Sequence, residues 1–188
     1  EPLSIEPSEP GPVQRIDHIG VASADNDSAI ETFSRQFGCP VESRQTDLEV
    51  RTTIESFTSD KYGVVYHNGP SEVVGGLRVT FITTGDCDLE FLQNFDPDHE
   101  GQTGNGHPGS TKQDQNAIAR FIARRGQGLH HIALKTTNIN GVLASLHAAG
   151  HHVIDAAGRP GSRRALIGFI HPSTLGGVLV HFVQREGP

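Results

Sequence analysis

Two segments of this sequence, more than a hundred residues apart, follow the same plan. Each contains a histidine near its start, His18 in one and His131 in the other, followed by Ile and small residues in a strand-like alternation. Each leads through a polar break into a helical pattern that ends at a glycine, Gly38 and Gly150 respectively. The two histidine-to-glycine spacings are 20 and 19 positions, and this agreement predicts an internal repeat.

After each helical pattern the sequence returns to strand-like alternation. Strands are predicted near 41–43, 77–83 and 88–93 after the first helix, and near 152–155, 165–170 and 178–184 after the second. The repeat unit is therefore βαβββ. We predict the α+β class, with two βαβββ modules that form an open, cup-shaped mixed β-sheet with the helices packed outside.

The remaining segments divide the chain further. We expect a flexible tail over residues 1–14, the first module over 15–95, a loop and connecting helix over 96–127, and the second module over 128–188. Residues 46–75 interrupt the first module, and a separate hairpin is one interpretation of them. Residues 98–113 are rich in Gly, Gln, Asn, Ser and His, which is typical of a mobile loop, either an active-site lid or plain surface.

Composition narrows the functional classes. A formal charge of −7 over 188 residues argues against a nucleic-acid surface, and the apolar runs are too short to span a membrane. The two cysteines, Cys39 and Cys87, lack a nearby partner and are expected to be free thiols in a reducing compartment. The acidic, proline-rich start predicts no secretory signal, so we expect a cytoplasmic protein.

Strand alternation assigns a face to each histidine. Side chains two apart lie on the same face of a strand, so His18 shares a face with Gly20, and His131 shares one with Ala133. This small-residue face is expected to line the concave side of the sheet. His131 is then predicted to point into the cleft, and His130 into the helix layer as a core histidine.

The last strand of each module supplies a complementary group. Glu90 lies between the apolar Leu89 and Phe91, and His181 has the same parity in the second module. A carboxylate in such a strand is costly unless it is paired or bound to a cation. The polar cleft residues are His18, Glu90, His131 and His181. This set suits Zn, Fe, Ni, Co or Mn, and the alternative is four isolated polar groups with local hydrogen bonds.

Several motifs resemble the vicinal oxygen chelate (glyoxalase-like) superfamily, most closely its methylmalonyl-CoA epimerases. The motifs are Asp17–Ala22, Arg125–Ala133, Arg159–Gly161, and Phe169–Pro172 leading to Gly176–Val180. The resemblance covers about Arg15 to Val183 apart from the two inserted stretches, and it is more specific in the second module. It implies paired βαβββ modules around one divalent metal, which makes the α-proton of a substrate acidic.

The resemblance also implies roles for particular residues. The metal ligands fall on His18, Glu90, His131 and His181, with Glu90 as the catalytic carboxylate. The family usually has Glu where this chain has His181, and the epimerases often have Lys where it has Ser173. The loss of one carboxylate is expected to strengthen Lewis acidity and weaken general-base capacity. Apart from the resemblance, Glu42, Glu49 and Glu72 are possible general bases of the first module, and no spacing argument chooses among them.

These observations support several functional hypotheses. The first is a metal-dependent epimerase, isomerase or lyase that stabilises an enolate-like intermediate on an acyl-CoA thioester or a related α-oxo or thiol-adduct substrate. The alternatives are a non-haem iron dioxygenase and a non-catalytic small-molecule-binding module. Arg163, Arg164 and His171 are candidate substrate contacts, although a solvated basic loop explains the arginines equally well. We expect a homodimer, in which the cup forms within one chain or by exchange of modules.

Overall fold

The computed structural model describes residues 13–59, 63–95 and 117–186, with the backbone path alone for 47–59, 63–74 and 95. Residues 1–12 of the expected tail (1–14) and the expected loop over 98–113 lie outside these residues.

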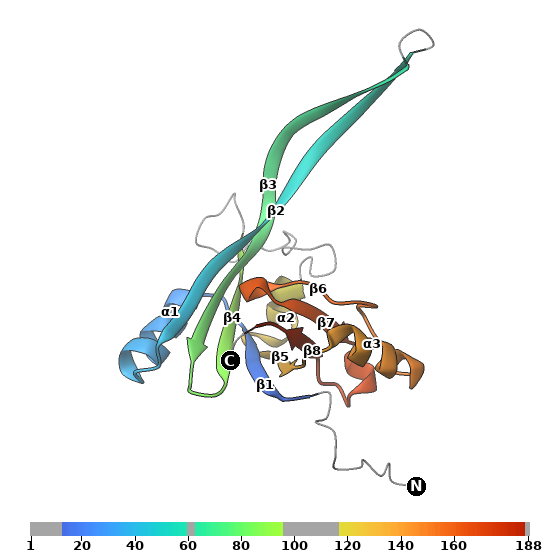
Figure 1. The fold of residues 1–188 in the computed structure, drawn as a ribbon. Coiled ribbons are helices and arrows are strands. Elements are labelled where there is room, and N and C mark those ends of the chain that lie inside the picture. Colours follow the sequence, from blue (N-terminus) through green and yellow to red (C-terminus); the bar gives the residue numbers. More distant parts are fainter. Residues whose placement is uncertain (1–12, 60–62, 96–116, 187–188) are drawn as a thin grey trace.

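Eight strands in the described ranges form one mixed sheet with the order β2-β3-β4-β1-β5-β8-β7-β6. The strands are β1 (Arg15–Ala22), β2 (Val41–Ser59), β3 (Gly63–Thr83), β4 (Asp88–Phe95), β5 (Gly128–Lys135), β6 (Arg159–Pro160), β7 (Leu166–Ile170) and β8 (Val180–Gln184). The first four strands form one half of the sheet and the last four form the other, with β1 and β5 antiparallel at the seam. The sheet curls into a cup (Figure 1), which confirms the predicted α+β fold class.

Strand register shows the internal repeat directly. In each half the first strand pairs in parallel with the last, β1 with β4 and β5 with β8. Gly20 pairs with Glu90 in the first half, and Ala133 pairs with His181 in the second. His18 therefore lies two residues before Gly20, the partner of Glu90, and His131 lies two residues before Ala133, the partner of His181. This common offset brings the four polar residues to one level of the cup.

The helices in the described ranges are α1 (Asn26–Ile30), which continues as a π-helical stretch η1 (Glu31–Gln36), α2 (Ala117–Arg125) and α3 (Ile139–Ala148), with 3₁₀ turns η2 (Ser162–Arg164) and η3 (Pro172–Thr174). Asp25 caps α1 by accepting hydrogen bonds from two backbone amides, and Asn138 caps α3 by accepting one from the amide of Gly141. None of these helices combines the length and the apolar character that a membrane crossing requires.

The core has separate parts on the two faces of the sheet. Leu143 of α3 packs with Ile170 and Phe182 on the face opposite the cup. On the concave side, Ile118 of α2 joins a cluster that includes Phe81 of β3. The predicted connecting helix is thus present as α2, and it covers apolar residues inside the cup rather than outside it.

The insertion in the first module is a long hairpin. β4 pairs with β3 only between Thr83 and Gly76, whereas the pairing of β2 with β3 continues as far as Ser59 and Gly63. Figure 1 shows the two strands leaving the body of the sheet together as an arm. Residues 46–59 therefore pair with 63–75, as the hairpin interpretation expected, but as continuations of β2 and β3 and not as a separate hairpin.

One predicted strand is wrong. The range 152–155 contains a single isolated bridge, between Val153 and Ile170. The carboxylate of Asp155 accepts the amide of Phe169 at 2.8 Å and also the Nε–H of Arg159 at 3.1 Å. Backbone bonds from the Ile154 amide to the Phe169 carbonyl and from the His171 amide to the His152 carbonyl remain, but the Asp155 side chain takes the Phe169 amide. The short β6 pairs with β7 further along the strand.

Candidate metal centre and cavity

A cavity of about 540 Å³ occupies the concave side of the sheet, and both modules line it. The polar residues of the floor are His18, Glu90, His130, His131 and His181. Much of the apolar wall is formed by Leu77, Phe81, Leu92, Ile118 and Phe169. The cationic lining residues are Arg159, Arg163 and Arg185. Glu90 is the only carboxylate among the described residues that line this cavity. The cavity thus combines an apolar wall with a concentrated set of metal-binding side chains.

Three buried histidines, His18, His131 and His181, form a group that could hold a metal ion, with one ring nitrogen from each within 4.8 Å of the others. The Nε2 atom of His18 lies 3.4 Å from Nε2 of His131 and 3.2 Å from Nε2 of His181. Oε2 of Glu90 lies 3.3 Å from Nε2 of both His18 and His131. A tetrahedral site with bonds of about 2.0–2.1 Å separates its donor atoms by roughly 3.3–3.4 Å. The three histidines therefore fit a metal ion, and the Glu90 carboxylate lies beside two of them.

The electrostatics of this group agree with its burial. Burial alone would raise the pKa of Glu90, but the neighbouring His18 and His131 outweigh it and hold that pKa well below its usual value. Burial opposes the charged form of His18, yet Glu90 and Asp17 raise its pKa overall. Burial, His131 and His18 lower the pKa of His181 well below its usual value. Converging nitrogen and oxygen lone pairs repel one another unless a proton or a metal ion lies between them.

Two β-bulges at the seam position the histidines. The pairing of β1 with β5 skips Asp17, between the pairs Ile16–Leu134 and His18–Ala133. It also skips His130, because Gly20 pairs with His131 while Val21 pairs with Leu129. A bulge puts an extra residue on one strand and re-aims its side chain. In both cases the extra residue immediately precedes a cluster histidine and contacts it.

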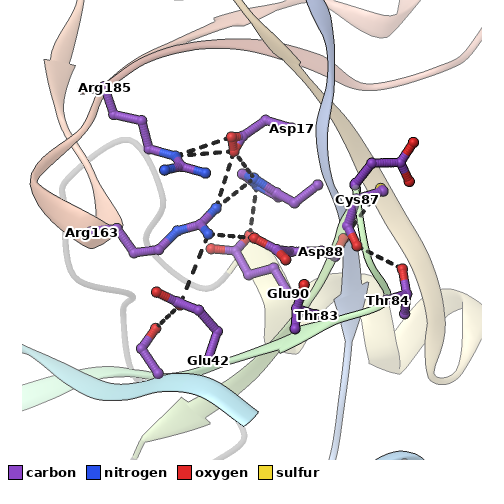
Figure 2. Close-up of polar contacts among 12 residues, drawn as sticks. Asp17, Glu42, Thr83, Thr84, Cys87, Asp88, Glu90, Arg163 and Arg185 are labelled. Atoms are coloured by element: carbon purple, nitrogen blue, oxygen red, sulfur yellow. Dashed lines mark hydrogen bonds and ion pairs between the residues drawn. The ribbon is translucent and has the colours of Figure 1, made fainter. Parts of the chain in front are cut away.

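Asp17 is fully buried and lies between two arginines of the second module, as Figure 2 shows. Nη2 of Arg163 donates to Oδ1 of Asp17 at 3.1 Å, and Nε of Arg185 donates to Oδ2 at 3.1 Å. Burial alone would raise the pKa of Asp17, but contacts with His18 and Arg185 hold it well below its ordinary value. The charged Asp17 carboxylate lies 3.6 Å from Nδ1 of His18, the ring nitrogen opposite the cluster.

Arg163 joins the two modules. Its Nη1 donates to Oδ2 of Asp88 at 2.6 Å, and its guanidinium stacks over the ring of Phe81 at 3.7 Å. Glu42 lies on the same side of the guanidinium at 3.9 Å (Figure 2). The Arg163 backbone has φ +57°, a left-handed conformation that costs energy in a non-glycine residue. Arg163 is therefore a tightly held part of the cavity wall.

His130 lies both against a helix and in the cavity. Its ring meets Phe121 of α2 edge-on, with the centroids 5.0 Å apart, as the predicted helix-facing orientation requires. The same ring lines the cavity, and its Nδ1 lies 2.9 Å from Nδ1 of His131. Burial and the charge of His131 lower the pKa of His130 to about 4. Strict alternation did not allow for this second role, because the bulge places neighbouring side chains together.

The structure brings the four predicted ligands together within a single chain. Among the predicted substrate contacts, Arg163 lines the cavity, whereas Arg164 is exposed and His171 stacks on His152 outside the cavity lining. The side chains of Glu49 and Glu72 lie outside the described residues.

Sequence reasoning missed three residues that form ion pairs around the histidines, and one of them, Arg185, also lines the cavity. They are Asp17, Asp88 and Arg185. Asp17 carried a detectable signal, because a charged residue directly before a predicted ligand in a buried strand needs a partner. The partner arginines are 146 and 168 positions away, and no spacing rule identifies them.

Comparisons with known proteins agree with this geometry. The sequence model of the Glyoxalase/Bleomycin resistance protein/Dioxygenase superfamily matches residues 17–169. The chain belongs to this superfamily. It is 25% identical over 132 residues to the Bacillus subtilis protein YqjC, covering 70% of this chain and 82% of that protein.

Epimerases are among its relatives. The chain is 26% identical over 110 residues to the mitochondrial methylmalonyl-CoA epimerase of Bos taurus, covering 58% of this chain and 53% of the relative. The methylmalonyl-CoA epimerase of Streptomyces coelicolor, solved in complex with 2-nitronate-propionyl-CoA, superposes with a TM-score of 0.60 at 23% identity, covering 93% of this chain and 99% of the other. At this identity, the structural likeness shows a common fold.

Proposed function

We propose that the protein is a metal-dependent epimerase, isomerase or lyase that removes a proton next to an activated carbonyl group. The single observation that carries this proposal is the convergence of His18, Glu90, His131 and His181 at the floor of a cavity with an apolar wall. The epimerase relatives support the same reaction class and make an acyl-CoA thioester the first substrate class to consider, followed by α-oxo and thiol-adduct compounds.

In this proposal the four side chains hold one divalent ion, chosen from Co, Ni, Zn, Mn and Fe. The bound ion would supply Lewis acidity toward a carbonyl oxygen of the substrate. With His181 as a neutral ligand, Glu90 supplies the only carboxylate of the set. The ion would therefore keep more of its positive charge than it would with two carboxylate ligands.

Glu90 is the catalytic carboxylate in this proposal, because no other described side chain on the cavity wall is a carboxylate. Its depressed pKa keeps it ionised, which is the form that a metal ligand requires. The apolar wall, formed in part by Phe81 and Phe169, would exclude water from the reacting carbon. The arginines favour an anionic substrate. Contacts of substrate with Arg164 and His171 stay predictions.

A non-haem iron dioxygenase is the second candidate, and one observation favours it. No carboxylate outside the proposed ligand set lines the cavity among the described residues, and oxygen activation does not require a separate carboxylate base. Two histidines and a carboxylate are a known Fe(II) arrangement, although a third histidine would fill a further position. A binding module without catalysis would retain ligand binding after loss of Glu90 and His131.

The proposal is tested by metal analysis of the purified protein together with proton exchange. We expect near one equivalent of a divalent metal per chain, and deuterium incorporation from heavy water into one member of an acyl-CoA panel. Glu90→Gln should lose both, whereas Glu31→Gln, at an exposed ion pair with Arg35, should lose neither. Absence of metal uptake would overturn the metal site. Metal without exchange, but with substrate-dependent oxygen consumption, would favour the dioxygenase.

A further inference from the structure

His130 is a buried imidazole that touches a proposed metal ligand without belonging to the ligand set. We infer that His130 is a positioning residue whose Nδ1 accepts the Nδ1–H of His131, so that Nε2 of His131 presents its lone pair to the metal centre. This inference rests on the proposed metal site and concerns how one ligand is held in its tautomer and orientation.

The direction of the hydrogen bond follows from the two ends of the His131 ring. Its Nε2 faces the cluster, 3.3 Å from Oε2 of Glu90 and 3.4 Å from Nε2 of His18. A neutral imidazole with its lone pair at Nε2 carries its proton on Nδ1. That Nδ1–H lies 2.9 Å from Nδ1 of His130, which must then be the acceptor. The proton of His130 consequently resides on its own Nε2.

The backbone is built to make this contact. Without the bulge at His130, alternation would put His130 and His131 on opposite faces of β5. With it, the two rings meet nearly perpendicular, with their centroids 5.2 Å apart. Phe121 of α2 supports the other side of His130. The ring of His131 is also confined over Gly20, where an added Cβ would lie 2.1 Å from its Cε1 atom.

At the equivalent place in the first module, Nδ1 of His18 faces a carboxylate at a longer distance, and Nη2 of Arg163 lies 3.5 Å from the same nitrogen. Asp17 is the bulge residue before His18, and its Oδ1 lies 3.6 Å from Nδ1 of His18. Ligand histidines are generally oriented through their second ring nitrogen by a carboxylate, a carbonyl or water. His130 supplies that acceptor for His131 as a neutral group, with no carboxylate or arginine required.

Three substitutions of His130 distinguish the effect of its Nδ1 acceptor from the effect of its ring packing. His130→Asn keeps an acceptor close to the Nδ1 position, His130→Gln moves the amide to the Nε2 position, and His130→Phe keeps the ring against Phe121 without any nitrogen. The affinity of the metal-free protein for Zn²⁺ and Co²⁺ is measured by competition with a chelator, and the Co²⁺ absorption spectrum reports the ligand geometry.

We expect His130→Phe and His130→Gln to weaken metal binding by about 10–100-fold, the usual cost of losing such an orienting partner, and to change the Co²⁺ spectrum. His130→Asn should stay close to wild type. His152→Phe is the control, because this exposed imidazole stacks on His171 away from the centre and should change nothing.

The possible outcomes separate the role of His130 from the proposed metal site on which it depends. Wild-type affinity in His130→Phe would overturn the inference alone, and equal weakening in His130→Asn and His130→Phe would overturn the role of Nδ1. Should His130→Phe fail to fold by circular dichroism, the contrast between the Asn and Gln variants decides. If wild type binds neither ion, the proposed metal site and the inference both fail.

Discussion

The two modules place their histidines by the same backbone device and then support them with different chemistry. In each, a bulge residue precedes the histidine and approaches its Nδ1. In the first module that residue is Asp17, whose charge is matched by two arginines reaching over from the second module. In the second module it is His130, which is kept neutral by a low pKa. The repeat thus preserves a geometry and leaves the supporting side chains free to differ.

The positions across the seam differ as well. The ring of His131 lies over Gly20, which has no Cβ, whereas His18 pairs with Ala133, whose methyl group is fully buried. The two halves are therefore related in topology but not interchangeable in packing. This asymmetry can be tested residue by residue.

The largest effect is expected at the ionic support of the first module. Asp17→Ala leaves Arg163 and Arg185 without their shared carboxylate, and their side chains are only 10% and 13% exposed. Breaking a buried ion pair from one side costs about 3–5 kcal/mol in unfolding free energy. Urea denaturation of the metal-free protein measures it. His130→Asn, at the equivalent bulge, should cost less than about 1 kcal/mol because a neutral contact is kept; similar losses at both positions would contradict the comparison.

A smaller effect is expected where the two halves pack differently. Gly20→Ala drives a methyl group into the His131 ring, so we expect a loss of about 1–3 kcal/mol and weaker Zn²⁺ binding. Ala133→Gly, at the repeat-equivalent position, removes a methyl group, costs about 1 kcal/mol and should leave Zn²⁺ affinity nearly unchanged. Calorimetric titration with Zn²⁺ checks both variants. Equal losses of affinity would show that the histidines are packed alike after all.

The smallest effect compares one arginine that joins the modules with one inside a single module. Arg163→Lys loses the forked contact with Asp17 and Asp88 and the stacking on Phe81, which should cost about 1–2 kcal/mol. Arg44→Lys alters an exposed pair with Asp27 and should cost less than about 0.5 kcal/mol. Thermal unfolding of both variants measures the contrast. An Arg163→Lys variant as stable as wild type would show that Arg163 does not stabilise the contact between the modules.

Much of the centre could be predicted because it depends on period and parity. The two-residue alternation of side chains along repeated strands predicts one common face for His18, Glu90, His131 and His181. Such local patterns are visible in a sequence. The alternation failed at His130, because a bulge depends on the register of the facing strand. Pairing of the predicted strand at 152–155 is likewise limited to one isolated bridge, and the Asp155 side chain accepts the next backbone amide, that of Phe169.

Helix periodicity had a similar limit in the first module. Ile30, Phe33 and Phe37 follow the spacing of an apolar helical face, but Phe37 is 65% exposed. The chain there is π-helical, and the amide of Phe37 bonds to the carbonyl of Thr32. The wider turn rotates Phe37 away from the core. The arginine partners of Asp17 could not be predicted from the sequence for another reason. An ion pair between distant segments forms only once the fold has brought those segments together.

The seam also bears on how the chain acquires its structure in time. His18 lies 113 residues before His131 and 163 before His181. Contacts between residues so far apart in sequence require a loss of loop-closure entropy before they stabilise the fold, so they form late in folding. Neither half alone brings more than two of the proposed ligands together. A metal ion that binds there would meet its full ligand set only after the halves have docked, and would act mainly by slowing their separation.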